Sequence, residues 1–173
     1  INPVVRLDVS KTALVADTSR HPFGLICDSH AQEIDTTASR RLRRGADFLA
    51  AVEFMVGAGY HPKAGRTTVQ LAESFAQRMA RSGEGHFPFS AEATAHELGL
   101  KRRAVYNHAR YLRELGLIAY VEHGSKRNVL RTRYGSAWTS EHGYRGTATL
   151  FAAVAPRVWD EAMGRRIEGE GYT

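Results

Sequence analysis

The strongest constraint on the fold is a series of local signals between residues 90 and 135. Small and apolar residues at helical spacing predict a short helix over Ala91–Leu98, with Ser90 as its N-cap. Gly99 follows this helix, and glycine accepts the positive φ of a helix C-cap or turn without a Cβ clash. Apolar spacing then predicts a longer helix over residues 101–115. Two helices joined by a tight glycine turn are therefore expected.

The segment after the second helix predicts a β-hairpin. Gly116 ends the helix, and residues 117–121 predict a strand. Residues 123–128 form a polar turn, and residues 129–134 predict a return strand with alternating basic side chains. Such a helix pair followed by a hairpin with a basic tip resembles the winged-helix domain of bacterial DNA-binding proteins. We therefore expect a mainly α fold with a small β-hairpin (α+β), a winged helix-turn-helix with extra N- and C-terminal helices.

The positive charge of the chain is concentrated in this segment. Residues 101–133 contain nine Lys and Arg against Glu114 and Glu122, a net charge of +7, whereas the whole chain carries +6. A basic patch that coincides with a nucleic-acid-binding motif is typical of a DNA contact surface. The alternative, a solvated basic face on a helical domain, does not account for that coincidence. Double-stranded DNA is therefore the expected partner.

The helical period assigns the DNA-contacting side chains. Val105, Ala109 and Leu112 face inward, so the side chains between them project outward, toward the major groove in the docking mode of this motif. The predicted DNA-binding residues lie at the start of the first helix, on the outward face of the second, and on the hairpin: Ser90, Lys101, Arg102, Arg103, Tyr106, Asn107, Arg110, Ser125, Lys126, Arg127, Asn128 and Arg131.

Within this set, two roles are expected. Arg103 and Asn107 are the base-reading candidates, because arginine pairs with guanine and asparagine with adenine through two hydrogen bonds. Tyr106 either packs against a thymine methyl group or holds a phosphate. Lys126 and Arg127 lie on a predicted turn without a rigid scaffold, which favours phosphate contacts.

A helix buried on two sides is predicted over residues 36–56, with Asp35 or Thr36 as its N-cap. Four arginines near its start oppose the positive end of the helix dipole. They are expected to contact an anion or, equally, to pair with nearby carboxylates; they are Arg40, Arg41, Arg43 and Arg44.

The remaining segments predict further elements around the motif. Residues 67–70 have capping-box spacing and open another helix, and residues 86–90 predict an extended piece that adds a strand beside the hairpin. Residues 147–154 are apolar and equally compatible with strand and helix. Residues 157–167 predict a last helix, in which Trp159 either anchors the helix to the body or mediates self-association.

The sequence divides into three parts on this interpretation. Residues 1–35 form a β-rich arm, 36–135 the winged-helix domain with two leading helices, and 136–173 a C-terminal extension. The arm either reaches DNA or a partner or, as we favour, packs on the helical body as a small β-segment. Because the chain opens on Ile1 and not on methionine, we expect it to be a piece of a longer protein.

No catalytic, metal or cofactor motif stands out, so we expect no enzyme activity, no metal and no cofactor. The eight histidines form no ligand-spacing pattern, and no phosphate-binding loop or small-molecule pocket is evident. No apolar run is long enough to cross a membrane. The single cysteine, Cys27, is consistent with a cytoplasmic protein, associated with the nucleoid or a plasmid.

A narrower resemblance rests on four segments, which read 111-YLRELGL-117, 121-VEHGSKRN-128, 147-TATLF-151 and 158-VWDEAMG-164. Together with Arg66–Val69 and the Arg40–Arg44 stretch, they are similar to helix-turn-helix proteins of actinobacterial plasmids and integrated elements. The resemblance covers residues 38–173 and implies a replication-associated or regulatory DNA-binding role.

Two functions follow as expectations. The first is a replication initiator or replicon-maintenance factor of a plasmid or mobile element. The second is a transcriptional regulator that binds an operator as a dimer. A homodimer is expected for either one, because the helix over residues 36–56 and the Trp159 helix present more apolar surface than one small winged helix covers.

Overall fold

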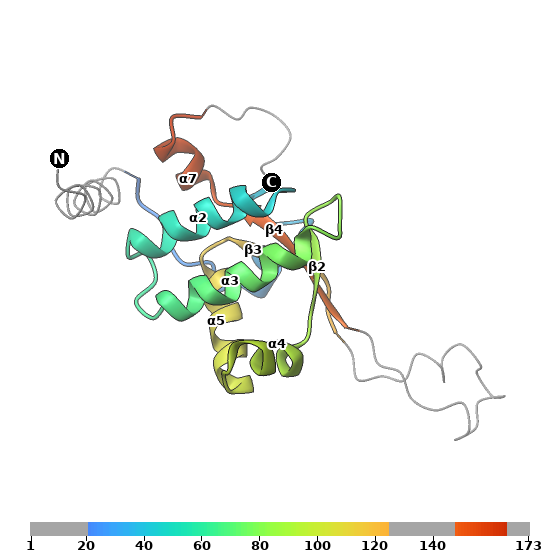
Figure 1. Ribbon diagram of the computed structural model, residues 1–173. Coiled ribbons are helices and arrows are strands. Elements are labelled where there is room, and N and C mark those ends of the chain that lie inside the picture. The colour runs from blue at the N-terminus through green and yellow to red at the C-terminus, as the bar shows by residue number, and fades with distance from the viewer. Residues whose placement is uncertain (1–20, 125–147, 166–173) are drawn as a thin grey trace, which may run out of the picture.

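The computed structural model describes residues 21–124 and 148–165 (Figure 1). They form a mixed α+β fold of five α-helices, one short 3-10 helix and a four-stranded antiparallel sheet. The elements in chain order are η1 (Ser29–Gln32), β1 (Arg40–Arg41), α2 (Gly45–Gly57), α3 (Arg66–Met79), β2 (His86–Phe89), α4 (Ala91–Leu98), α5 (Arg102–Glu114), β3 (Ile118–Glu122), β4 (Thr149–Ala155) and α7 (Arg157–Ala162).

Strand β4 is the centre of the sheet and pairs with every other strand. It lies antiparallel to β3 on one edge and to β2 and β1 on the other. The segment over residues 147–154, ambiguous in the sequence, is a strand from Thr149 onward. It was assigned to a C-terminal extension, yet it holds the sheet together.

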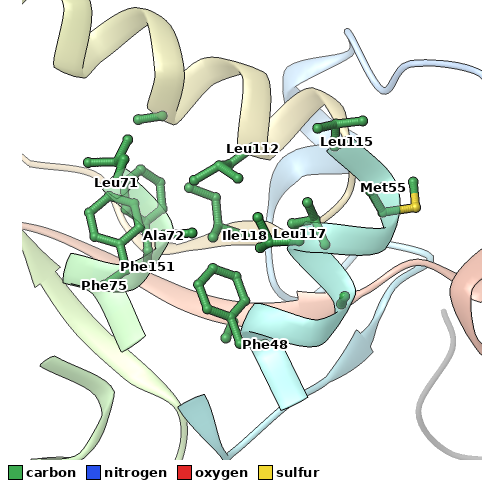
Figure 2. Close-up of a cluster of buried hydrophobic side chains, with 14 of the residues drawn as sticks. Phe48, Met55, Leu71, Ala72, Phe75, Leu112, Leu115, Leu117, Ile118 and Phe151 are labelled. Atoms are coloured by element: carbon green, nitrogen blue, oxygen red, sulfur yellow. The ribbon is translucent and has the colours of Figure 1, made fainter. Parts of the chain in front are cut away.

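The main core lies between one face of this sheet and helices α2, α3 and α5. Phe75 of α3 stacks on Phe87 of β2 with ring centroids 4.6 Å apart, and Phe151 of β4 lies 6.0 Å from Phe87. Figure 2 shows side chains from α2, α3, α5 and the sheet converging on this cluster, among them Phe48 and Leu112. All five of these side chains are almost completely buried.

The predicted helix over residues 36–56 begins nine residues later, at Gly45. Arg40 and Arg41 pair with β4, and the Leu42 N–H continues that ladder to Ala153 O at 2.9 Å. These long-range hydrogen bonds hold the segment extended and overrule its helical pattern. The predicted N-caps Asp35 and Thr36 are therefore wrong.

The four arginines consequently lie before the helix and not in its first turn. Arg40 Nε donates to Asp160 Oδ2 and its Nη2 to Asp160 Oδ1, both at 3.1 Å. This pair confirms for Arg40 the predicted alternative of pairing with a carboxylate. Arg41, Arg43 and Arg44 are exposed.

The predicted return strand over residues 129–134 lies outside the described residues. The strand that pairs with β3 is β4, from Ile118↔Ala153 to Glu122↔Leu150. The pairing of β3 with residues 129–134 stays a prediction. Strand β4 is apolar and buried from Phe151 onward.

The described part of the N-terminal segment packs on the body but forms no named strand. Ile26 N–H donates to Glu114 O at 2.8 Å, and Ile34 N–H donates to Tyr120 O at 2.9 Å. A single parallel bridge between Glu33 and Tyr120 covers the outer edge of β3. Residues 21–35 of the predicted β-rich arm form no strand, whereas the predicted packing on the body is confirmed for them; residues 1–20 lie outside the described residues.

Two helix ends differ from the prediction. Helix α3 begins at Arg66 after the N-cap Gly65, whose N–H donates to Thr68 Oγ1 at 3.1 Å, so the predicted cap at Thr67 is wrong by two residues. Helix α7 ends at Ala162, because Gly164 turns the chain with φ of 75°, and does not reach residue 167.

The apolar surfaces that suggested a homodimer are buried within one chain. Trp159 is 3% exposed, which confirms its predicted role as the anchor of α7. The apolar face of α2 packs against α3, the sheet and α7. The large hydrophobic side chains exposed in residues 21–124 and 148–165 are Tyr106 and Met163. The homodimer remains a prediction, but its original premise is wrong.

Candidate nucleic-acid interface

Helices α4 and α5 meet at the predicted glycine turn. Ser90 caps α4, since its Oγ accepts a hydrogen bond from Ala93 N–H at 3.3 Å. Gly99 adopts φ of 66°, and the next residue donates its N–H to Ala95 O at 2.9 Å, which closes the end of α4. Lys101 is the N-cap of α5. The predicted positions of both helices are confirmed to within one residue at each end.

Helix α5 buries one side and exposes a basic side. Val105, Ala109 and Leu112 are completely buried, as predicted. Five predicted DNA-binding residues are exposed, and a sixth, Asn107, is partly buried; the exposed ones are Lys101, Arg102, Arg103, Tyr106 and Arg110. The structure thus brings six of the twelve candidates together on one helix.

Tyr106 is held by the body while half of it remains open to solvent. Its side chain is 51% exposed, and its ring meets Phe89 of β2 edge-on, with centroids 5.9 Å apart. A ring fixed on one side and open on the other loses little conformational entropy when it makes a contact. The sequence prediction did not include Phe89, although the alternation in β2 places Phe87 and Phe89 on one face.

Two arginines counted in the basic segment have partners within the chain. Arg110 Nε lies 4.0 Å from Glu114 Oε1, and its guanidinium stands over the Tyr111 ring at 5.5 Å. Arg113 donates from Nε to Gln32 Oε1 at 3.0 Å, and desolvation lowers the pKa of this guanidinium. Arg113 therefore fastens the N-terminal segment to α5 and does not belong to the interface.

The ends of β3 and β4 lie beside the exposed side of α5. Phe89, which contacts Tyr106, is paired with Thr149 at the start of β4. Thr149 Oγ1 in turn accepts a hydrogen bond from Gly124 N–H at 3.0 Å. The chain therefore leaves β3 and returns to β4 next to the Tyr106 side of α5. The candidates Ser125, Lys126, Arg127, Asn128 and Arg131 belong to the segment between these ends and lie outside the described residues.

A polar network behind this surface joins α5 to the turn between α2 and α3. His61 is buried, and its Nδ1 accepts a hydrogen bond from Lys63 N–H at 3.1 Å. Its Nε2 therefore carries the proton and donates to Glu114 Oε1 at 2.9 Å. The other carboxylate oxygen of Glu114 lies 3.8 Å from Cys27 Sγ. The network fixes the C-terminal end of α5 to two segments distant in sequence.

A second chain of hydrogen bonds fixes the middle of α5. Thr68 Oγ1 accepts from Gly65 N–H, so its own hydroxyl proton is free to donate to His108 Nδ1 at 2.8 Å. Burial lowers the pKa of His108, and the neighbouring His61 lowers it further. Both effects favour the neutral imidazole, whose Nδ1 can accept the Thr68 hydroxyl proton. His108 is partly buried and contacts α3, as expected of a histidine beside the core.

Acidification is expected to destabilise the fold through His108. Because the pKa of His108 is lower in the folded chain than the ordinary 6.5, the folded state binds fewer protons below that value. The free energy of unfolding should accordingly fall as the pH drops below 6.5. Urea unfolding at about pH 7.5 and about pH 5.5 measures the loss.

His108→Gln is the matched control for this prediction, because its amide oxygen can accept the Thr68 hydroxyl proton without titrating. The variant should lose less stability on acidification than the wild type. A variant that lost as much would show that other histidines, and not His108, cause the pH dependence.

Among residues 21–124 and 148–165, no group of three or more His, Cys, Asp or Glu side chains is placed to hold a metal ion. No helix in these two stretches is long and apolar enough to span a lipid bilayer. His96 is exposed on α4, and Glu97 hydrogen-bonds Ser74 of α3.

Comparison with known proteins adds no relative to these observations. No protein-family model, curated protein sequence or solved structure matches the chain.

Proposed function

We propose that this chain is a sequence-specific double-stranded DNA-binding protein of the winged helix-turn-helix class. One observation carries the proposal. The exposed basic side of α5 lies on the same side of the molecule as Gly124 and Thr149, which flank the segment over residues 125–147. In this proposal α4 and α5 form the helix-turn-helix, and the segment between β3 and β4, with its basic residues 126, 127, 131, 133 and 145, is the wing.

The proposed mechanism places α5 in the major groove. The major groove presents a different pattern of donors and acceptors for each base pair, and helix-turn-helix proteins read it with the N-terminal part of the second helix. Arg103 is exposed there and is the candidate for guanine, and Asn107 is the candidate for adenine. Tyr106, braced by Phe89, supplies a contact to a thymine methyl group or a phosphate. The wing residues Lys126 and Arg127 neutralise phosphates.

Substitutions on α5 should separate base reading from phosphate binding. Arg103→Ala or Asn107→Ala is expected to cost about 1–3 kcal/mol of binding free energy on the cognate site and little on random DNA. Lys126→Ala should weaken binding to both DNAs alike and reduce the salt slope by about one unit. Fluorescence anisotropy at several salt concentrations measures these effects.

Arg41→Ala is the matched control, because Arg41 is an exposed arginine that lies on β1 and not on α5. It should leave both affinities almost unchanged. Loss of specificity in Lys126→Ala but not in the α5 variants would reverse the assigned roles. Equal losses of DNA affinity in the Arg103 and Arg41 variants would mean that the protein binds DNA only through general charge attraction.

Within this class, we propose a replication initiator or replicon-maintenance factor of a plasmid or mobile element, on the sequence resemblance alone. A transcriptional regulator that binds an operator as a dimer is the second candidate. Sequencing the genomic fragments that the protein retains distinguishes the two. Clustered direct repeats beside a replication gene support the initiator, and a single palindrome at a promoter supports the regulator.

A further inference from the structure

A groove of about 540 Å³ lies between α3, α4 and the outer edge of β2, outside the proposed DNA-binding surface. Side chains from four elements line it, among them Arg78, Arg81, His86, Pro88, Glu97 and Leu150. Its volume lies within the range of small-molecule sites in proteins. No residue of the groove belongs to the predicted DNA-binding set.

The charge of the groove favours an anion. Arg78 and Arg81 contribute its cationic groups, against the carboxylate of Glu97, while His86 Nδ1 lies 3.5 Å from Glu84 Oε2. That carboxylate is already engaged, because it accepts a hydrogen bond from Ser74 and lies 3.9 Å from Arg78 Nη2. Arg81 is exposed at the end of the groove. A ligand with a negative group therefore meets guanidinium groups there.

The floor of the groove favours a ligand with an apolar body. Pro88 of β2 is paired with Leu150 of β4, so both side chains lie on the face of the sheet opposite Phe87 and Phe89, around the outer edge of β2 from α3. Pro88 also lacks an N–H, which disfavours the addition of a peptide strand along the open edge of β2. The occupant that fits is consequently a small molecule and not an extended peptide.

We propose that this groove binds a small organic anion, with its carboxylate, sulfonate or phosphate group at Arg78 and Arg81 and its apolar part over Pro88 and Leu150. Because Arg78 also contacts Glu97 of α4, an anion at Arg78 competes with the contact between α3 and α4. The ligand therefore changes how α4 is held, and, as a consequence that rests on the proposed function, it changes DNA affinity.

The test uses the DNA-free protein and 8-anilinonaphthalene-1-sulfonate, a probe that joins a sulfonate to an apolar ring system. A two-dimensional ¹H–¹⁵N NMR titration should show saturable shifts centred on amides around residues 74–88 and 97. Arg81→Gln should lower the affinity for the probe about tenfold, as expected for the loss of one charge-assisted hydrogen bond. Arg66→Gln, at the opposite end of α3, is the matched control and should leave probe affinity unchanged.

Shifts centred on α5, shifts that do not saturate, or equal weakening by both variants would overturn the groove as a site. Inorganic phosphate is the second probe, and it should bind more weakly because it lacks an apolar part. Equal affinity for phosphate would overturn the organic part of the proposal. A probe that saturates the groove without changing DNA affinity would overturn only the link to α4, whereas failure of DNA binding itself would leave the groove result intact.

Discussion

Gly85→Ala is expected to lower the free energy of unfolding by about 2–5 kcal/mol, the sum of a backbone and a packing penalty. Gly85 has φ of 77°, a left-handed conformation that side chains with a Cβ rarely adopt. A Cβ at this position would also overlap the carbonyl oxygen of Leu42. That oxygen belongs to the backbone, so it cannot rotate away as a side chain does. Urea unfolding followed by circular dichroism measures the loss.

Gly59→Ala isolates the backbone part of this penalty. Gly59 also has φ of 77°, but beyond its chain neighbours a Cβ there meets no atom within 4 Å. Its replacement should therefore cost only about 1–2 kcal/mol. Similar losses in the two variants would mean that the approach of Leu42 to Gly85 relaxes freely. In that case the junction of β1, β2 and β4 would not be the tight joint that the structure describes.

The helix pair α4–α5 was predictable because its signals are local. A serine N-cap, a glycine C-cap and the helical spacing of Val105, Ala109 and Leu112 all lie within a few residues of the structure that they specify. The outward residues of α5 followed from the same period. This part of the candidate site therefore needed no knowledge of the rest of the fold.

The sheet was not predictable in the same way, because its order depends on pairing between distant segments. Arg40–Arg41 is a strand only because β4 lies beside it, more than 100 residues later in the sequence. The central place of β4 depends on three such pairings. Local patterns in residues 36–44 favoured a helix, and tertiary hydrogen bonds overruled them.

The roles of individual charged residues could not be predicted from the sequence either. Arg113 and Arg103 have the same formal charge and lie on the same helix, yet one binds Gln32 and the other is exposed. The difference arises from the N-terminal segment, which crosses the C-terminal end of α5. The ring contact between Tyr106 of α5 and Phe89 of β2 likewise depends on two different elements. The helical period separates inward from outward side chains but does not identify what covers them.

The ion pair between β1 and α7, in which Asp160 is buried and Arg40 is 24% exposed, leads to the second large effect. Asp160 is 1% exposed and accepts two hydrogen bonds from Arg40 and one from Arg165, whose Nη1 lies 3.3 Å from its Oδ1. Removing one partner of a buried pair leaves a charge in a medium that solvates it poorly. Arg40→Met keeps an apolar side chain of similar length and is therefore expected to cost about 3–5 kcal/mol of unfolding free energy, with the lower value favoured because Arg165 remains.

Arg165→Met is the matched control, since it removes a cation from the same carboxylate at a site that is 42% exposed. An exposed partner contributes little, so this variant should cost about 0–1 kcal/mol. Adding Asp160→Asn to Arg40→Met should recover part of the loss, because the uncompensated charge is removed together with its partner. If Arg40→Met were no more destabilising than Arg165→Met, water would have to reach Asp160. The joint between β1 and α7 would then be stabilised by the packing of Trp159 and Val158 and not by the ion pair.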